Sequence, residues 1–110
     1  MKNTLQDKKA VGEIKTRAKK YQGYYTHLIE MRKLLALEDA YKRYHLQYGF
    51  YFNFFGEDTL YIYTIQDIRK YGWNSSGSYN HTTAAPSEKV EKQMVHIPTR
   101  YATKFSLVDG

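Results

Sequence analysis

Eight residues near the middle of the chain, YGFYFNFF (48–55), place large apolar side chains on both faces of an extended strand. Such a run is typical of a central strand that is covered on both sides, because both alternating sets of side chains must leave water. Gly56, Glu57 and Asp58 follow as a turn, and LYIYTI (60–65) returns as an antiparallel strand. The sequence therefore predicts a β-hairpin at the centre of the fold.

A short helix is expected directly after this hairpin. Thr64 precedes Asp67 by three residues, which is the spacing of a capping box. The helix would run through Ile68 and Tyr71 and end at Gly72, a residue type that often terminates helices.

A longer helix is predicted over residues 25–45, which contain no Gly or Pro and are rich in good helix formers. Its apolar side chains recur at helical spacing and form one stripe: Leu34, Leu37, Tyr41 and Tyr44. One turn toward the N-terminus this stripe reaches Glu30, and an unpaired carboxylate on a buried face is costly. We therefore expect Glu30 to have a partner, either a cation or a metal-bound water. The alternative is a first-turn acid that the helix dipole favours.

The remaining segments complete a single domain, 1–110, of the α/β class. Residues 72–89 are polar and are expected to form a flexible loop, which is either mobile or a binding loop. Residues 90–97 alternate in part and are expected to form an edge strand that Pro98 closes. A chain of 110 residues buries one core. The predicted architecture is a small mixed sheet with a long helix packed on it.

Composition narrows the classes of partner. The net charge of +6 suits a polyanion such as nucleic acid, and the alternative is a soluble protein that happens to be basic. The absence of cysteine excludes disulfides and thiolate metal sites. No segment approaches the ~20 apolar residues of a membrane span, and residues 1–9 are too polar for a secretory signal. The expected location is cytoplasmic, without membrane contact. The histidines lack metal-ligand spacing, and His27 and His45 are expected at helix ends.

The segment VGEIKTR (11–17) is expected to be a strand with a charged face. Because side chains alternate along a strand, Val11, Glu13 and Lys15 would share one face and Ile14 would point into the core. In metal-dependent phosphodiesterases a carboxylate holds a divalent cation, and a lysine steadies the attacking water or the charged phosphorane. The alternative is an ordinary solvated strand face.

Three segments, in their order along the chain, resemble the core of the PD-(D/E)XK nucleases, the restriction-endonuclease-like superfamily. EIKTR (13–17) is similar to the Glu-x-Lys strand of that family, and IEMRK (29–33) is similar to the Glu-x-x-Lys helix start of many phage and resolvase-like members. The strands 50–55 and 60–67 are similar to a strand, turn, strand and Asp-containing helix start in the family. The resemblance spans residues 11–71 and implies a restriction-endonuclease-like core.

The resemblance also implies a reaction, the hydrolysis of a phosphodiester bond in DNA with Mg²⁺ or Mn²⁺. Carried over, Glu13 would be a metal ligand and Lys15 the catalytic lysine, with the backbone carbonyl of Ile14 completing the metal shell. Glu30 and Lys33 would form a second acid–base pair that orients a metal-bound water or contacts the phosphate.

The sequence departs from the family pattern before Glu13. Family members carry an essential Asp on the strand that precedes Glu-x-Lys, and Asp7 is the sole acid among the twelve residues before Glu13. Asp7 is therefore the further candidate metal ligand. The alternatives are a shortened piece of a larger nuclease, completion of the fold by a second subunit, and an inactive protein.

Basic and aromatic side chains are candidates for contacts with nucleic acid. The candidates for phosphate contacts are Arg17, Lys19, Lys20, Arg32 and Lys33. The alternative is a solvated basic face. Trp73, with Tyr71 and Tyr79, is a candidate for stacking on bases, and the alternative is a plug at the end of a small core.

Three function hypotheses follow. The first is a DNA-binding, nuclease-like hydrolase. The second is a noncatalytic small phage or mobile-element protein that binds a protein or a nucleic acid through a tyrosine-rich surface. The third is a homodimer that completes a short sheet through an exposed edge strand.

Overall fold

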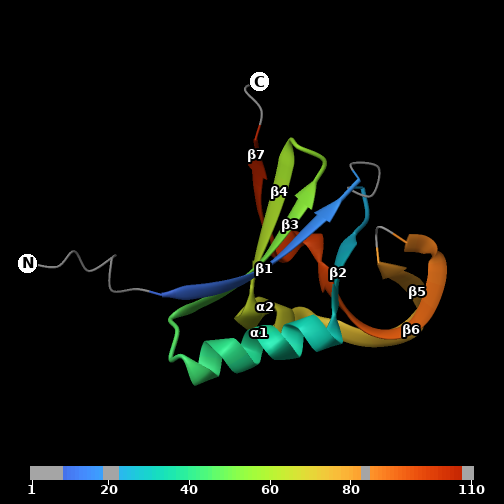
Figure 1. Ribbon diagram of the computed structural model, residues 1–110. Coiled ribbons are helices and arrows are strands. Elements are labelled where there is room, and N and C mark those ends of the chain that lie inside the picture. The colour runs from blue at the N-terminus through green and yellow to red at the C-terminus, as the bar shows by residue number, and fades with distance from the viewer. Residues whose placement is uncertain (1–8, 19–22, 83–84, 108–110) are drawn as a thin grey trace, which may run out of the picture.

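The computed structural model describes residues 9–18, 23–82 and 85–107. These residues form two β-sheets and two α-helices (Figure 1). The first sheet has the order β1-β3-β4-β7, with the bounds Ala10–Arg17, Tyr48–Phe55, Thr59–Thr64 and Thr103–Ser106. The second sheet has the order β2-β6-β5, with the bounds Thr26–Glu30, Ala85–Pro98 and Trp73–Thr82. The helices are α1 (Met31–Arg43), α2 (Ile65–Tyr71) and a 3₁₀ turn, η3 (Thr99–Tyr101).

The hairpin predicted from the aromatic run is confirmed. Strands β3 and β4 pair antiparallel, with Phe50 opposite Thr64 and Phe55 opposite Thr59. Gly56 lies in the turn with a φ of 61°, a left-handed conformation that glycine adopts without a Cβ clash. Strand β3 lies between β1 and β4, so its prediction as a central strand is also confirmed.

Helix α2 begins and ends as predicted. The backbone N–H of Asp67 donates to Oγ1 of Thr64 over 3.1 Å, which satisfies one of the free N–H groups of the first turn. At the other end, the N–H of Gly72 donates to the carbonyl of Ile68 over 2.9 Å. The cap therefore depends on residues that are close in sequence.

The predicted fold class, one small mixed sheet with a long helix packed on it in a restriction-endonuclease-like core, is wrong. The described chain is mostly strand in two sheets, and its α-helices have 13 and 7 residues. The helix expected over residues 25–45 begins only at Met31, because residues 26–30 pair with β6 as strand β2. That pairing buries the side chains of His27 and Ile29. The free energy gained from this burial outweighs the helix propensity of the segment. His27 is thus a buried strand residue, not a helix-end residue.

The polar stretch expected as a loop over residues 72–89 contributes strands to the second sheet. Strand β5 pairs with β6, with Trp73 opposite His96 and Asn74 opposite Val95. The edge position predicted for residues 90–97 is wrong, because β6 lies between β2 and β5. Asn, Ser and Gly have low strand propensity, so β5 depends on the backbone hydrogen bonds that β6 provides.

Strands β1 and β3 are parallel, with Glu13 opposite Tyr51 and Lys15 opposite Asn53. Parallel neighbours need a crossover connection, and here β2 and α1 lie between the two strands in sequence. Because β2 joins the second sheet, the crossover ties the two sheets together. It also brings the start of α1 near β1, where Lys33 lies 3.6 Å from Glu13.

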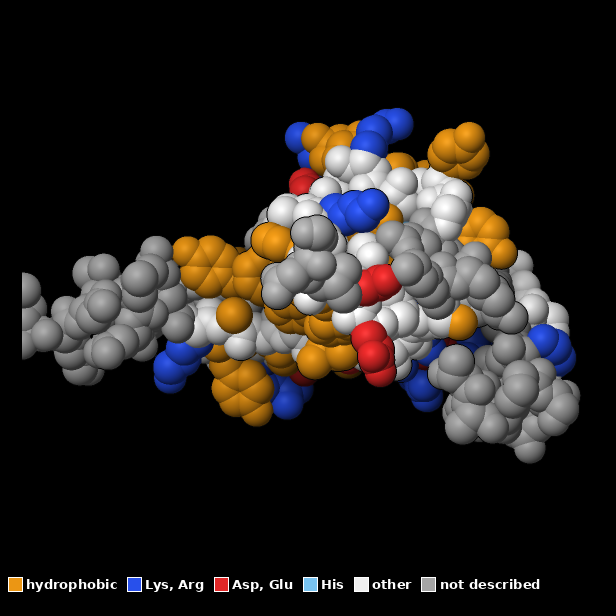
Figure 2. All heavy atoms as spheres, turned by 90° about the horizontal axis from the view of Figure 1, so that it is seen from above, with side chains coloured by type: hydrophobic (Ala, Val, Ile, Leu, Met, Phe, Trp, Pro, Cys, Tyr) orange, Lys and Arg blue, Asp and Glu red, His pale blue; other side chains and the backbone are white. Residues whose placement is uncertain are grey.

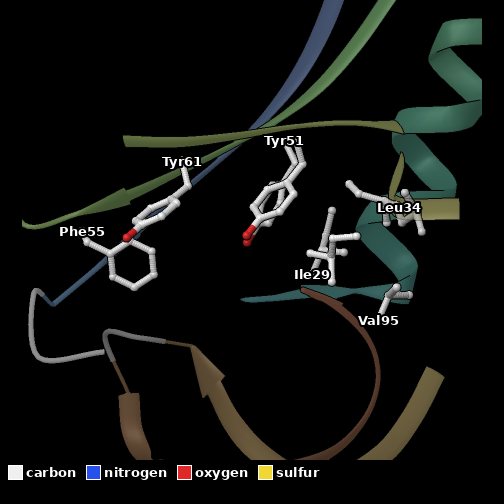
Figure 3. Close-up of a cluster of buried hydrophobic side chains, with 9 residues drawn as sticks. Ile29, Leu34, Tyr51, Phe55, Tyr61 and Val95 are labelled. Carbon is white, nitrogen blue, oxygen red and sulfur yellow. The ribbon is translucent and has the colours of Figure 1, made fainter. Parts of the chain in front are cut away.

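The hydrophobic core fills the space between the two sheets and α1 (Figure 3). Its buried members come from six elements: Ile29, Leu34, Tyr51, Phe55, Tyr61, Tyr63, Ile68, Val95 and Ile97. The stripe predicted on α1 is confirmed at Leu34 and Leu37, whereas Tyr44 at the C-cap is 65% exposed. His45 follows that C-cap, as expected.

Large apolar side chains also reach the surface. Ile14, Tyr25, Trp73 and Phe105 all belong to this exposed set. The face seen from above shows apolar side chains with lysine and arginine side chains around them (Figure 2). None of the helices in the described ranges is long and apolar enough to cross a bilayer.

Candidate functional site

Glu13, Lys15 and Arg17 share the half-buried face of β1, as the alternation predicts. The prediction for Ile14 is wrong, because its side chain lies on the opposite face and is 64% exposed. The charged face turns toward β2 and α1. There its side chains form a hydrogen bond to the backbone of β2 and an ion pair with a lysine of α1. Alternation defines the two faces of a strand, but it does not decide which face the fold covers.

Arg17 links the first sheet to the second. Its Nη2 donates to the carbonyl of Leu28 on β2 over 2.8 Å, and its Nε donates to Oδ1 of Asn53 over 3.2 Å. The hydroxyl of Tyr51 donates to the same carbonyl over 2.7 Å. Burial raises the pKa of Tyr51, while Arg17 acts in the opposite direction, so the phenol keeps its proton at neutral pH. Arg17, a candidate for phosphate contacts, is therefore used in joining the sheets.

Glu30 has cationic partners, which confirms the expectation that this carboxylate is not alone. It lies at the N-cap of α1 and at the end of β2, rather than inside a helix. Its Oε1 is 2.8 Å from Nζ of Lys92, and its Oε2 is 3.6 Å from Lys33 and 3.8 Å from Arg32. Burial acts to raise the pKa of Glu30, but the hydrogen bond and charge of Lys92, with Lys33 and Arg32, hold it below its ordinary value. Glu30 is therefore ionised at neutral pH.

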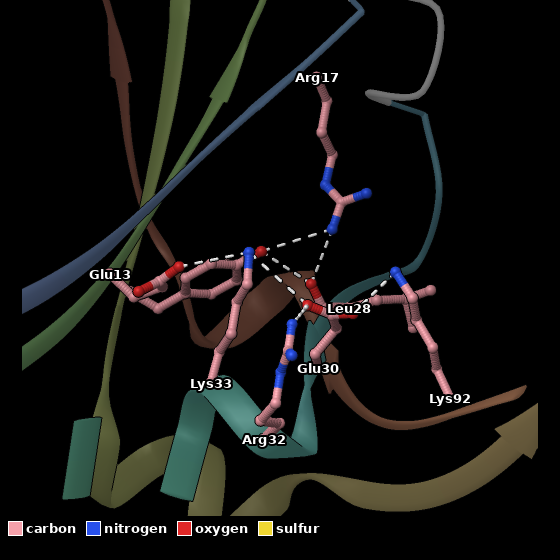
Figure 4. A network of polar contacts seen from close by, with 8 residues as sticks. Glu13, Arg17, Leu28, Glu30, Arg32, Lys33 and Lys92 are labelled. Carbon is pink, nitrogen blue, oxygen red and sulfur yellow. Dashed lines mark hydrogen bonds and ion pairs between the residues drawn. The ribbon is translucent and has the colours of Figure 1, made fainter. Parts of the chain in front are cut away.

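Lys33 stands between the two predicted carboxylates. Its Nζ lies 3.6 Å from Oε1 of Glu13 and 3.6 Å from Oε2 of Glu30 (Figure 4). Lys33 is on the first turn of α1, one turn after Glu30, so the i,i+3 spacing places both residues on one side of the helix. The two acid–lysine pairs of the sequence, Glu13 with Lys15 and Glu30 with Lys33, thus lie in one cluster.

The position of Lys15 alters its acid–base behaviour. Burial lowers the pKa of Lys15, and the charges of Arg17 and Lys33 lower it further, whereas Glu30 opposes the shift. A lysine in these surroundings loses its proton more readily than an ordinary surface lysine. It is also the amine of the cluster that lies on the same strand face as Glu13.

Two members of the cluster were missed in the sequence. Lys92 lies on β6, far along the chain from Glu30, and no local pattern connects the two. Asn53 is fully buried on β3, and its Nδ2 has no hydrogen-bond partner among the described residues. The sequence does mark Asn53, since it is the single amide inside an aromatic run. A polar side chain in such a strand needs a hydrogen-bond partner.

The remaining predicted residues lie outside the described ranges, at the margin of the cluster or away from it. Asp7, Lys19 and Lys20 lie outside the described residues, so their candidate roles stay predictions. Arg32 reaches Glu30 only at 3.8 Å, and its side chain is 84% exposed. Tyr71, a candidate for base stacking, instead stacks on Tyr101 at a centroid distance of 3.9 Å.

The donor set limits which cation this site can hold. No three acidic or histidine side chains in the described part of the chain come close enough together for a metal ion. Two carboxylates, Glu13 and Glu30, do face one cationic atom, and Mg²⁺ is often held by one or two carboxylates together with water and phosphate oxygens. A divalent ion at this site would have these two carboxylates as its acidic ligands, with water and phosphate oxygens completing its shell.

The charge balance of the cluster favours an anion. The two carboxylates are accompanied by five cationic side chains: Lys15, Arg17, Arg32, Lys33 and Lys92. An excess of ammonium and guanidinium groups at a partly open site is typical of phosphate binding. The arrangement can therefore hold a phosphodiester beside two carboxylates. Comparison of the chain with protein-family models, curated proteins and solved structures finds no match.

Proposed function

We propose that this protein binds the phosphodiester backbone of DNA at the cluster and hydrolyses it with the help of Mg²⁺ or Mn²⁺. One observation carries the proposal: Glu13 and Glu30, from two different sheets, converge on Nζ of Lys33 at 3.6 Å each, with Lys15 beside them. This combination of two carboxylates and two lysines is also the part of the chain that resembles the PD-(D/E)XK nucleases.

Glu13 and Glu30, with the backbone carbonyl of Ile14, are the groups that would hold the divalent ion. When bound, such an ion polarises the phosphate and supplies a water of lowered pKa. Lys33 balances the same carboxylates when no divalent ion is bound, since it pairs with both. Asp7 is a further ligand candidate in this proposal.

The remaining side chains act on the phosphate and its developing charge. Lys15 stabilises the negative charge of the pentacoordinate phosphorus, and its lowered pKa also makes it a competent proton donor. Lys92 and Arg32 bind the non-reacting oxygens while keeping Glu30 ionised. The excess of cations attracts the DNA backbone before any chemistry takes place.

A plasmid-nicking assay in Mg²⁺ and in Mn²⁺ tests the reaction. We expect Glu13→Gln and Lys15→Met each to lower the nicking rate by about 100-fold or more, because each removes a group that acts in the transition state. The matched controls are Glu57→Gln and Lys42→Met, which change the same charges at exposed positions away from the cluster. Circular dichroism verifies that each variant is folded. Nicking that survives both cluster substitutions contradicts the proposed mechanism.

Binding without hydrolysis is the second candidate function. Both carboxylates are already paired with ammonium groups, and cations outnumber them, which favours an anion over a divalent cation. Calorimetric titration with Mn²⁺ separates the two functions. Absence of Mn²⁺ uptake together with retained DNA binding supports this second candidate, and Mn²⁺ uptake that Glu13→Gln abolishes supports the first.

A further inference from the structure

A hollow of about 480 Å³ lies at the end of the second sheet, where β2 and β5 begin and β6 ends. Its volume falls in the range of ~300–1,000 Å³ that is typical of pockets for small ligands. The residues that line it are Tyr25, Thr26, Trp73, Pro98, Thr99 and Arg100. Two of them are large aromatic side chains, and one carries a positive charge.

Trp73 is exposed in the hollow, but neighbouring side chains hold its ring in place. The Trp73 indole is 50% exposed and stacks on the His96 imidazole, with centroids 5.5 Å apart and planes at 4°. The His96 ring is in turn hydrogen-bonded through Nε2 to the hydroxyl of Ser75. Trp73 is therefore a preformed flat surface, and no ordering of its ring is needed when a ligand stacks on it.

The opposite wall is anchored through the backbone. The N–H and the hydroxyl of Thr99 both donate to the carbonyl of Tyr25, over 2.8 and 3.1 Å. The ring of Tyr25 nevertheless remains 92% exposed. The positive group beside this wall is Arg100, whose guanidinium lies 4.9 Å from the centre of the Tyr101 ring.

The hollow lies on the same face of the second sheet as Glu30 and Lys92, the two members of the charged cluster that this sheet contributes. Thr26 and Glu30 are four residues apart on β2, so their side chains share a face, about 13 Å apart at ~3.3 Å per residue. Directly opposite residues of antiparallel strands also share a face, which places Trp73 beside His96. Lys92, four residues before His96 on β6, belongs to that face as well.

We infer that the hollow binds an unpaired base of single-stranded nucleic acid, stacked on Trp73, while the backbone runs along β2 and β6 toward Lys92. Charge complementarity selects this occupant: the path leads from Arg100 to a cluster with five cations, in a chain of net charge +6. Stacking on aromatic side chains is how single strands are held without sequence preference. The inference rests on the proposed nucleic-acid binding, and it adds that the bound nucleic acid is single-stranded.

Trp73 is the only tryptophan in the chain, so its fluorescence reports on the hollow directly. The experiment uses the whole chain with excess EDTA, which removes metal-dependent cleavage, and titrates it with a 12-residue oligothymidine. We expect saturable quenching by this oligonucleotide. An abasic oligomer and a duplex of the same length should quench much less, because neither presents an unpaired base.

Variants are compared through the anisotropy of a labelled oligonucleotide. Trp73→Ala should weaken single-strand binding about 5- to 150-fold and leave duplex binding unchanged, since base–aromatic stacking is worth ~1–3 kcal/mol per base. Trp73→Phe should restore most of the affinity, and Phe105→Ala removes an exposed ring from the first sheet as the matched control.

The outcomes separate this inference from the proposed reaction. Equal quenching by the abasic oligomer, or single-strand affinity unchanged in Trp73→Ala, overturns the inference even if nicking is observed. Quenching that persists in Glu13→Gln while nicking is lost supports both. Quenching without any nicking in the unmodified protein supports the stacking site and contradicts the hydrolysis alone.

Discussion

At the residue scale, His27 is a titratable group buried in the core. Its side chain is 3% exposed and lies against the rings of Phe55, Tyr61 and Tyr63. Nδ1 is 2.6 Å from the hydroxyl of Tyr63, whereas Nε2 has no partner among the described residues. Burial, with a smaller contribution from the charge of Arg17, lowers the pKa of His27 to about 4. Burial also raises the pKa of Tyr63, so the phenol keeps its proton and can donate it to Nδ1.

The buried imidazole predicts a loss of stability in mild acid. The unfolded chain binds a proton at His27 near pH 6.5 and the folded chain only near pH 4, so stability falls as the pH drops through this window. The expected loss is on the order of 3 kcal/mol at the bottom of the window. Urea unfolding between pH 7.5 and pH 4 measures it. His27→Gln, which keeps an acceptor for Tyr63, should flatten the dependence, and an unchanged slope in that variant would assign the effect to other groups.

At the element scale, short connections with strong local signals set the clearest boundaries. Thr64 ends β4 and caps α2 in one residue, so the strand and the helix share a fixed junction. The absence of a side chain at Gly49 on β3 leaves room for the Ile65 side chain at this junction. A Cβ at position 49 would lie 2.0 Å from Cδ1 of Ile65. The hairpin and α2 therefore form one unit whose geometry depends on a cap and a glycine.

The cap predicts a specific cost when its oxygen is removed. Thr64→Ala should lower the free energy of unfolding by about 1 kcal/mol, because the N–H of Asp67 loses its acceptor. Thr64→Ser keeps the hydroxyl and should recover most of the loss. Chemical denaturation of the three proteins measures the difference, and a serine variant as unstable as the alanine variant would show that packing of the threonine methyl matters instead.

At the scale of the whole molecule, polar contacts join the sheets beside the hydrophobic core. Arg17 on β1 and Tyr51 on β3 both donate to the carbonyl of Leu28 on β2, so a single acceptor of the second sheet holds two strands of the first. The same region carries Glu13 and Glu30. Sheet packing and the candidate site therefore depend on one another.

Removal of the Arg17 side chain should reveal this structural role. Arg17→Met should lower the free energy of unfolding by about 1–3 kcal/mol, because Asn53 and Leu28 lose a charged donor in a half-buried region. Arg43→Met is the matched control, since it breaks only an exposed pair with Asp39 on α1 and should cost less than about 0.5 kcal/mol. Unchanged stability combined with weaker DNA binding would place Arg17 among the phosphate contacts instead.

The parts of the fold that follow from the sequence alone are those in which interacting residues are neighbours along the chain. The hairpin over residues 48–65 and the Thr64 cap depend on turn chemistry and alternation within a few residues. The partnered state of Glu30 was also predictable, because a carboxylate near a buried face requires a counter-charge. The grouping of Glu13 with Lys15 followed from the two-residue period of a strand.

The tertiary structure alone decided which faces are covered and which distant segments meet. Alternation on β1 was correct, yet only the fold placed Ile14 in solvent and left Glu13 half-buried. Residues 26–30 became a strand because β6 supplied hydrogen bonds and a buried surface that outweigh helix propensity. Lys92 reached Glu30 for the same reason. Long-range pairing depends on the backbone of a partner strand, and no local pattern in the chain encodes that partner.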